Sequence, residues 1–169
     1  MAVTAPFDFM EWIRDNRHLL KPPVGAKRVY PNAEFIVMVV GGPNQRTDYH
    51  VDPGEEFFYQ IEGDMVLKIV EDGEFKDILI KEGQIFLLPS NIPHSPQRYE
   101  NTVGLVIERN RREGEKDGLQ WYCRDCGEVV YADSFVCANL PKQIAEVMDV
   151  YGGSEELRTC KACGCVNEL

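Results

Sequence analysis

Two separate segments of the sequence combine turn glycines, strand-like runs and metal-binding side chains, and they constrain the fold most. The segment 42–63 contains His50 and Glu56, and the segment 83–98 contains His94. In both, glycines mark turns and an imidazole or carboxylate falls at the end of a strand-like run. Two histidines and one carboxylate are the usual ligands of a non-haem Fe(II) with open coordination positions. The two segments therefore predict a metal-binding β-barrel.

The region around these segments has the pattern of an antiparallel β-structure. Short β-rich runs alternate with turn residues, and the pair Asp72 and Gly73 between two runs is a strong hairpin signal. Several short strands at close spacing predict a sandwich or barrel. The expected strands are residues 35–40, 56–61, 65–70, 75–80, 85–88 and 103–108.

The N-terminal region predicts one short helix before the barrel. Residues 9–20 carry apolar side chains at helical spacing, Asp8 is placed to cap the start, and the Lys-Pro-Pro sequence of residues 21–23 ends the helix. His18 lies on this helix. A lone histidine in such a place is more often a surface or satisfied core residue than a ligand, so we do not expect it to bind metal.

The C-terminal region differs in composition from the barrel. The charged residues 109–118 predict a solvated linker or arm, and residues 141–151 predict a helix. We therefore divide the chain into a domain of residues 1–118, with the N-terminal helix and the barrel, and an appendage of residues 119–169. The appendage is too short for a large core, so we expect it to depend on a metal for order.

The appendage contains two Cys-x-x-Cys pairs, each followed by glycine. Two such pairs are a strong signal for a tetrahedral four-thiolate site for zinc or iron. A closed sulfur shell has no open position, so the site is structural or transfers electrons. The four residues are Cys123, Cys126, Cys160 and Cys163. Two further cysteines, Cys137 and Cys165, are expected to be ordinary thiols, although Cys165 is close enough to compete for the metal.

Composition limits the classes of protein that the chain can belong to. Its 169 residues suit one domain with a small appendage, and 44% hydrophobic with 27% charged residues is typical of globular proteins. A formal net charge of −10 argues against nucleic-acid or anionic-membrane binding. The first residues lack the apolar run of a signal peptide, and no stretch has the roughly 20 apolar residues of a membrane span. We expect a cytoplasmic protein.

Glu55 and Glu56 compete for the carboxylate position of the metal site. Adjacent residues of a strand face opposite sides of the sheet, so only one of them points inward. The spacing to Gly63 favours Glu56. Glu55 is then expected to face solvent or to lie outside the ligand set.

Three further charged residues are candidates for the same site. Arg46 lies four residues before His50, and Arg98 lies four residues after His94. A guanidinium beside a metal suits a carboxylate or a bound oxygen species. Glu108 ends an apolar strand, where a buried carboxylate needs a cationic partner. Each alone could be a surface charge, but their positions beside the two motifs favour a role in the site.

The two histidine segments match the two motifs of the cupin superfamily, with two departures. Asp48 replaces the usual first histidine, and the gap from His50 to the glutamate is one residue longer than usual. Nearly the whole chain resembles the 3-hydroxyanthranilate 3,4-dioxygenase family in its short bacterial and fungal form. The segments that carry this resemblance are LLKPPVG (19–25), VVGGPNQRTDYH (39–50), EEFFYQIEGD (55–64), EGQIFLLPSNIPHSPQR (82–98), GLVIER (104–109), WYCRDCG (121–127) and RTCKACG (158–164).

The resemblance implies roles for the candidate residues. It implies a cupin barrel in which His50, Glu56 and His94 bind catalytic Fe(II), with Asp48 either a fourth ligand or, as we expect, a neighbour of the ligands. It further implies substrate contacts from Arg98, Glu108 and Glu56, an oxygen-side role for Arg46, a rubredoxin-like four-cysteine site that holds iron or zinc, and a homodimer. Relatives usually carry asparagine where this chain has Ala26, which puts the closure of a substrate loop in doubt.

The implied reaction is the cleavage of an aromatic ring by dioxygen. The family converts 3-hydroxyanthranilate to 2-amino-3-carboxymuconate semialdehyde, which cyclises to quinolinate in tryptophan catabolism or NAD synthesis. Histidine and carboxylate ligands alone do not exclude manganese, nickel or cobalt, and zinc would activate water instead. Two rival hypotheses are a non-catalytic metal-binding cupin joined to a zinc ribbon, which would act in binding or regulation, and a cupin isomerase.

Overall fold

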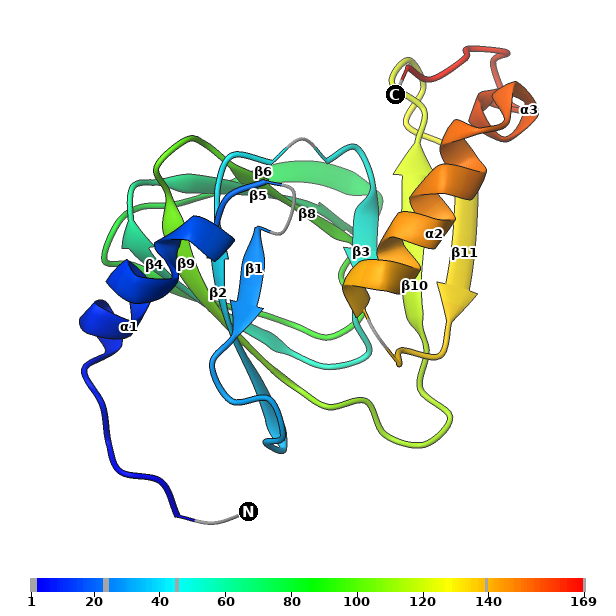
Figure 1. Cartoon of the computed structure of the whole chain (residues 1–169). Coiled ribbons are helices and arrows are strands. Elements are labelled where there is room, and N and C mark those ends of the chain that lie inside the picture. The colour runs from blue at the N-terminus through cyan, green and yellow to red at the C-terminus, as the bar shows by residue number, and fades with distance from the viewer. Residues whose placement is uncertain (1–2, 23–24, 45, 139, 169) are drawn as a thin grey trace.

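Two antiparallel sheets face each other and enclose the core of a barrel (Figure 1). The computed structural model describes residues 3–22, 25–44, 46–138 and 140–168. The five-stranded sheet has the order β1 (Ala26–Arg28), β2 (Phe35–Gly41), β9 (Val103–Arg109), β4 (Glu56–Glu62) and β7 (Ile85–Leu88). The six-stranded sheet has the order β11 (Val129–Phe135), β10 (Asp117–Tyr122), β3 (Tyr49–Val51), β8 (His94–Arg98), β5 (Met65–Glu71) and β6 (Glu74–Ile80).

The six strands predicted from the sequence are all present, each within one residue of its expected ends. Asp72 and Gly73 form the turn between β5 and β6, and both have positive φ angles, 52° and 79°. Positive φ at both central residues is the geometry of the type I′ hairpin turn that this residue pair favours. The predicted mainly β fold, with two antiparallel sheets, a short N-terminal helix and a cysteine-bearing appendage, is confirmed.

The core lies between the two sheets and is filled by alternate residues of each strand. On β4, for example, Phe58 is buried and points inward, whereas its neighbours Phe57 and Tyr59 lie on the outer face of the sheet. Both sheets contribute to the cluster, which consists of Phe58, Met65, Leu67, Ile69, Ile80, Leu88 and Val106. This apolar layer occupies one part of the barrel and leaves the other part to polar residues.

The N-terminal helix packs against the outer face of the five-stranded sheet. It comprises α1 (Phe9–Asn16) and a single 3-10 turn at Arg17–Leu19. The Asp8 carboxylate accepts a hydrogen bond from the Glu11 backbone N–H at 2.7 Å, which confirms the predicted cap. Ile13 is fully buried against Val39 and Val103. Pro23, part of the expected stop signal, lies outside the described residues.

The C-terminal appendage is joined to the barrel by a shared sheet. Strand β10 pairs with β3 of the barrel on one side and with β11 on the other, so the division at residues 118 and 119 falls within β10. The predicted helix is confirmed as α2 (Leu140–Gly152), and α3 (Glu155–Arg158) follows it. Trp121 stacks on Tyr151 of α2 with ring centroids 4.2 Å apart, and this contact anchors the helix on the extended sheet.

The prediction of a solvated linker over residues 109–118 is wrong for two of its residues. The side chain of Arg111 is only 6% exposed, and Asp117 is fully buried. The remaining charged residues of this segment are exposed or half-buried. The segment therefore does more than span the distance between barrel and appendage, because it inserts a charged pair into the interior.

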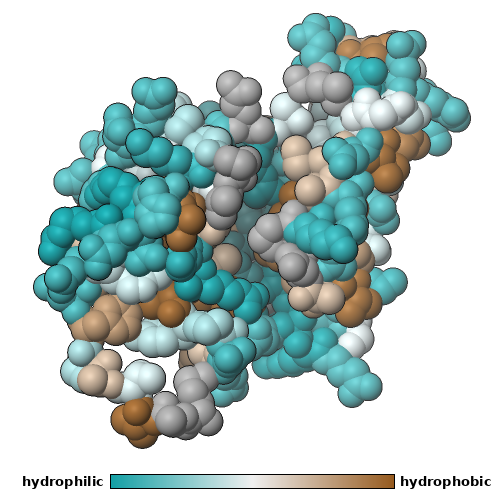
Figure 2. All heavy atoms as spheres, in the orientation of Figure 1, coloured by the Kyte–Doolittle hydropathy of each residue, from teal (hydrophilic) through white to brown (hydrophobic). Residues whose placement is uncertain are grey.

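The surface has the character expected from the composition. Figure 2 shows a largely hydrophilic face, with hydrophobic atoms gathered mainly along the appendage around α2. No helix in the described part of the chain is long and apolar enough to cross a membrane.

Candidate active site

Three predicted metal ligands meet inside the barrel. His50 on β3 is the direct cross-strand partner of His94 on β8, and Glu56 opens β4 on the opposite sheet. All three are at most 4% exposed, and their ligand atoms lie within 4.8 Å of one another. Glu55 is exposed, so Glu56 is the inward-facing member of the pair. The strands thus bring two imidazoles and one carboxylate to a single point.

The hydrogen bonding of His94 leaves the lone pair of its Nε2 atom available for a donor or a metal. Its Nδ1 lies 2.9 Å from the Ile92 carbonyl oxygen, which can only accept, so Nδ1 carries the proton. The Nε2 lone pair then faces Glu56 Oε1 at 2.9 Å, and that oxygen is buried with no hydrogen-bond donor among the described residues. A second proton or a metal ion relieves the repulsion between the two electron pairs. The donor set therefore fits a divalent metal.

The protonation of the carboxylate is compatible with metal binding. Burial alone would raise the pKa of Glu56, but the neighbouring His94 and His50 rings and Arg111 reverse this effect and bring the pKa to about 2. Burial tends to lower the pKa of His94, and Glu56 overcomes it, so the pKa of His94 is raised. Glu56 is thus an anionic ligand at neutral pH, and a metal would compete with a proton for His94.

His50 is oriented by a residue that sequence reasoning missed. Its Nε2 lies 2.8 Å from Asp117 Oδ1, and its Nδ1 faces Glu56 Oε1 at 3.7 Å. Burial alone would raise the pKa of Asp117, but hydrogen bonds from His50 and Arg111 lower it to about 2. Because the carboxylate is ionised, Nε2 donates the hydrogen bond and Nδ1 keeps the lone pair that a metal could use.

Arg98 is a buried cation without a carboxylate partner among the described residues. It is 4% exposed, and its guanidinium donates one hydrogen bond, from Nη1 to the Gln60 amide oxygen at 3.3 Å. Burial lowers the pKa of Arg98 to about 10, and the nearby Arg46 adds to this effect. At Gly104, a Cβ atom would lie 2.6 Å from Arg98 Nη1, so only glycine leaves room for the guanidinium.

Glu108 on β9 has the cationic partner that its burial required. Its Oε2 accepts a hydrogen bond from Arg111 Nη1 at 2.5 Å, and the residue is 3% exposed. Burial raises the pKa of Glu108, and the nearby Glu56 carboxylate raises it further. Glu108 is also the direct cross-strand partner of Glu56. It therefore lies beside the metal ligands.

Arg46 and Asp48 form an ion pair at the edge of the site. Arg46 Nε donates to Asp48 Oδ1 at 3.0 Å, and a second bond joins Nη2 to Oδ2. Burial tends to raise the pKa of Asp48, but Arg46 more than compensates and holds it below its usual value. Both carboxylate oxygens of Asp48 are engaged by Arg46, and Asp48 is not among the clustered ligand atoms.

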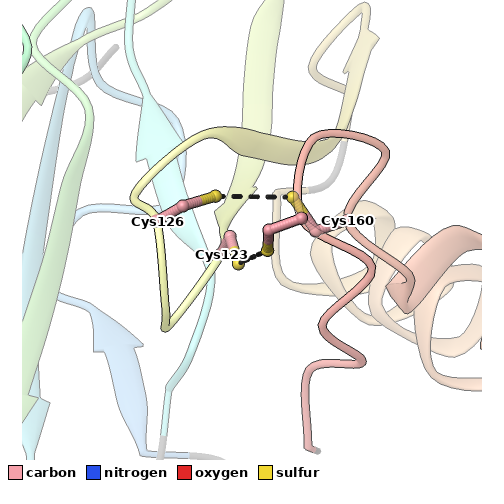
Figure 3. A group of neighbouring side chains, drawn as sticks. Cys123, Cys126 and Cys160 are labelled. Carbon is pink, nitrogen blue, oxygen red and sulfur yellow. Dashed lines mark hydrogen bonds between the residues drawn. The ribbon is translucent and has the colours of Figure 1, made fainter.

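The four paired cysteines form a second cluster in the appendage (Figure 3). Cys123 Sγ lies 3.5 Å from Cys163 Sγ, and Cys126 Sγ lies 3.6 Å from Cys160 Sγ. A disulfide requires about 2.05 Å between the sulfur atoms. Thiolates in tetrahedral positions around a metal at about 2.3 Å lie about 3.8 Å apart. The observed spacing therefore fits a tetrahedral four-sulfur metal site and not disulfides.

The two other cysteines lie outside this cluster, as expected. Cys165 contributes its backbone carbonyl, which accepts from the Cys160 N–H at 2.8 Å. Burial raises the pKa of the Cys137 thiol to about 11, and the nearby Asp117 carboxylate raises it further. Cys137 thus lies against the buried charges of the barrel, although the sequence marked it only as an ordinary thiol.

Comparison with known proteins identifies the family. Residues 1–152 match the family model of 3-hydroxyanthranilic acid dioxygenase. The chain is 53% identical over 168 residues to a 3-hydroxyanthranilate 3,4-dioxygenase of Jannaschia sp., covering 99% of this chain and 93% of the relative. It is 49% identical to the Neurospora crassa enzyme of the same name, covering 96% and 89%. The chain belongs to the 3-hydroxyanthranilic acid dioxygenase family.

A solved structure with a similar arrangement is a cupin-2 domain protein from Shewanella frigidimarina. It is 15% identical, covers 59% of this chain and 92% of its own, and has a TM-score of 0.46.

In this member of the 3-hydroxyanthranilic acid dioxygenase family, four buried polar residues around the site escaped sequence reasoning: Asp52, Gln60, Arg111 and Asp117. Asp52 Oδ1 accepts from the Gly54 N–H at 2.6 Å, and its Oδ2 lies 2.7 Å from Arg111 Nη2. Burial and the Glu56 charge raise the pKa of Asp52 to about 7. Of these four residues, only Gln60 had a signal in the sequence. It lies four residues after Glu56 on β4, so the alternation of a strand places both side chains on the inward face.

Proposed function

We propose that the protein is an Fe(II)-dependent dioxygenase that cleaves the ring of 3-hydroxyanthranilate to give 2-amino-3-carboxymuconate semialdehyde. The single observation that carries this proposal, beside the family, is the burial of Arg98 without an anionic partner in the described chain. A buried guanidinium is costly unless a charge neutralises it. The carboxylate of the substrate supplies that charge.

The strand geometry supports a binding space between Arg98 and the metal ligands. His94 and Arg98 share one face of β8, and Glu56 and Gln60 share one face of β4. Residues four apart on a strand are separated by about 13 Å along the backbone, which leaves room for an aromatic ring between the two ends. The carboxylate of the substrate then meets Arg98 while its hydroxyl and amine reach the metal ligands.

The remaining charged residues orient the other groups. Glu108, held by Arg111, accepts a hydrogen bond from the amine of the substrate, and Glu56 lies close enough to contact the same end of the ring. Arg46, fixed by Asp48, provides a positive charge on the oxygen side. Fe(II) bound by His50, Glu56 and His94 would supply the one-electron chemistry that dioxygen requires. The protein residues thus bind, orient and neutralise charge around it.

The four-cysteine cluster has a different task. Its closed sulfur shell, filled with iron or zinc, leaves no position for a substrate. We propose that it holds the appendage in place, since thiolate–metal bonds supply much of the ordering energy of a small segment. None of the six cysteines forms a disulfide, which supports the predicted cytoplasmic location.

The homodimer is proposed from the outer face of the five-stranded sheet. Ile85 and Leu87 of the edge strand β7 on this face are 66% and 54% exposed. Large exposed apolar side chains that share one face mark an interaction surface. Replacing Ile85 and Leu87 by aspartate should produce a monomer in light scattering, whereas Leu79→Asp on the other sheet, 51% exposed, should not. An unchanged mass for the double variant would exclude this face.

Oxygen consumption distinguishes the proposed function from its rivals. After anaerobic Fe(II) loading, the protein should consume oxygen with 3-hydroxyanthranilate and much less efficiently with 2-aminophenol, which lacks the carboxylate that Arg98 binds. A binding module or an isomerase would consume none. The product cyclises to quinolinate, so we propose a role in tryptophan catabolism or NAD synthesis.

A further inference from the structure

A single guanidinium connects the metal side of the site with the substrate side. Arg111 Nη1 donates to Glu108 Oε2 at 2.5 Å, and its Nε and Nη2 donate to Asp117 Oδ1 at 3.1 and 2.5 Å. The same Oδ1 of Asp117 accepts the Nε2 proton of His50 at 2.8 Å. A continuous chain of buried hydrogen bonds therefore runs from His50 to Glu108.

Each nitrogen of the Arg111 guanidinium has a hydrogen-bond or ion-pair partner. Besides Glu108 and Asp117, Nη2 lies 2.7 Å from Asp52 Oδ2, and Nη1 reaches the Arg109 carbonyl at 3.2 Å. The three carboxylates are at most 3% exposed. Such a planar fork fixes the relative orientation of the groups it binds, which the single ammonium of lysine cannot do.

We propose that Asp117 and Arg111 are positioning residues for the reaction. Asp117 holds the His50 ring with Nε2 protonated, so that its Nδ1 lone pair points to Glu56 and the metal. Arg111 holds Asp117 and Glu108 in one rigid unit, so that the metal ligand and the amine-binding carboxylate keep a fixed relation. The inference rests on the proposed function for the substrate side, but its metal side stands on the ligand cluster alone.

A purely structural role for the same network makes a different prediction. If Arg111 only neutralised buried carboxylates, loss of the network would lower stability without changing metal affinity or the state of the His50 ring. A positioning role changes both in a folded protein. Removing a partner that orients a ligating histidine typically weakens metal binding by about 10- to 100-fold.

The test uses Asp117→Asn, Arg111→Lys and a matched control in the full-length protein with its cysteine site filled. Glu115→Gln is the control, because Glu115 pairs with Arg109 in the same segment at 2.5 and 2.7 Å but does not contact the network. Fe(II) affinity is measured anaerobically by titration. We expect Asp117→Asn to weaken it about 10- to 100-fold and Glu115→Gln to leave it unchanged.

Substrate kinetics separate the two residues. Asp117→Asn should lower kcat, measured at saturating Fe(II), with little change in KM. Arg111→Lys should lower kcat and also raise KM, because Glu108 loses its fixed partner. Unchanged Fe(II) affinity in folded Asp117→Asn overturns the proposal.

A measurement on the wild type keeps the test decisive if a variant fails to fold. In the Zn(II)-loaded protein, nitrogen NMR should show His50 with a protonated, slowly exchanging Nε2 and a metal-bound Nδ1. Metal on Nε2 would overturn the proposal. Neither metal affinity nor the NMR signature requires turnover, so absence of ring cleavage in the wild type would refute the proposed function without touching this result.

Discussion

Replacing Arg98 by methionine should improve stability and damage substrate binding at the same time. The pKa of Arg98 is lowered to about 10 by burial, and this difference from 12.5 corresponds to about 3 kcal/mol by which the site disfavours the charged guanidinium. Methionine loses the hydrogen bond to Gln60, which contributes about 1 kcal/mol. The substrate-free variant should therefore be more stable by roughly 2 kcal/mol, or on the order of 5 °C in Tm.

The effect on substrate binding has the opposite sign. Loss of a charge-assisted pair in a water-poor pocket costs about 2–5 kcal/mol, which raises KM for 3-hydroxyanthranilate by tens- to thousands-fold. The bound iron should not change, because Arg98 is not among the clustered ligand atoms. Turnover of 2-aminophenol should be nearly the same in the wild type and in Arg98→Met, since that substrate has no carboxylate for Arg98 to bind.

Calorimetry and oxygen-electrode kinetics measure the two effects on matched samples. Arg17→Met is the control, because Arg17 is 40% exposed and pairs with Glu62 at the surface; it should change neither Tm nor KM appreciably. An unchanged KM for Arg98→Met would remove Arg98 from the carboxylate role. A lower Tm would refute the argument that its charge is uncompensated in the free protein.

Three further predictions follow from the site and the appendage. Glu56→Ala should lose catalytic iron, whereas Glu55→Ala, at an exposed position, should keep most of it; equal iron contents in metal analysis would contradict the inward orientation of Glu56. Replacing Cys123 and Cys126 by serine should speed proteolysis of the appendage while ring cleavage stays measurable, and loss of activity with catalytic iron still bound would refute a purely structural role. Ala26→Asn should raise kcat/KM if an amide closes a loop over the substrate, and unchanged kinetics would show that this departure from relatives is silent.

The barrel could be predicted from the sequence because its central strands carry their own signal. Strands β4 and β7 alternate or run apolar over their length, so their ends were predicted within one residue. The strands β3 and β8 are different, since Tyr49–Val51 and His94–Arg98 are short and polar. Their extended form depends on pairing with β10 and β5, which is a long-range effect that local patterns do not contain.

The residues of the site also divide into those with a local sequence signal and those without one. His50, Glu56 and His94 stand out because their residue types and glycine frames are unusual in a strand. Arg111 and Asp117 do not, because they belong to a run of charged residues that is typical of a solvated linker. Their burial follows from β10 pairing with β3, which carries Asp117 beside His50. Interior ion pairs of this kind become visible only when the fold brings their partners together.

The fate of dioxygen is the most direct test of the proposed ring cleavage. The protein is loaded anaerobically with Fe(II), supplied with 3-hydroxyanthranilate and isotopically labelled dioxygen, and the product is trapped and analysed by mass spectrometry before it cyclises. We expect one dioxygen to be consumed per substrate, with both labelled atoms in 2-amino-3-carboxymuconate semialdehyde. Absence of oxygen uptake, or a ring-opened product without the label, would contradict it.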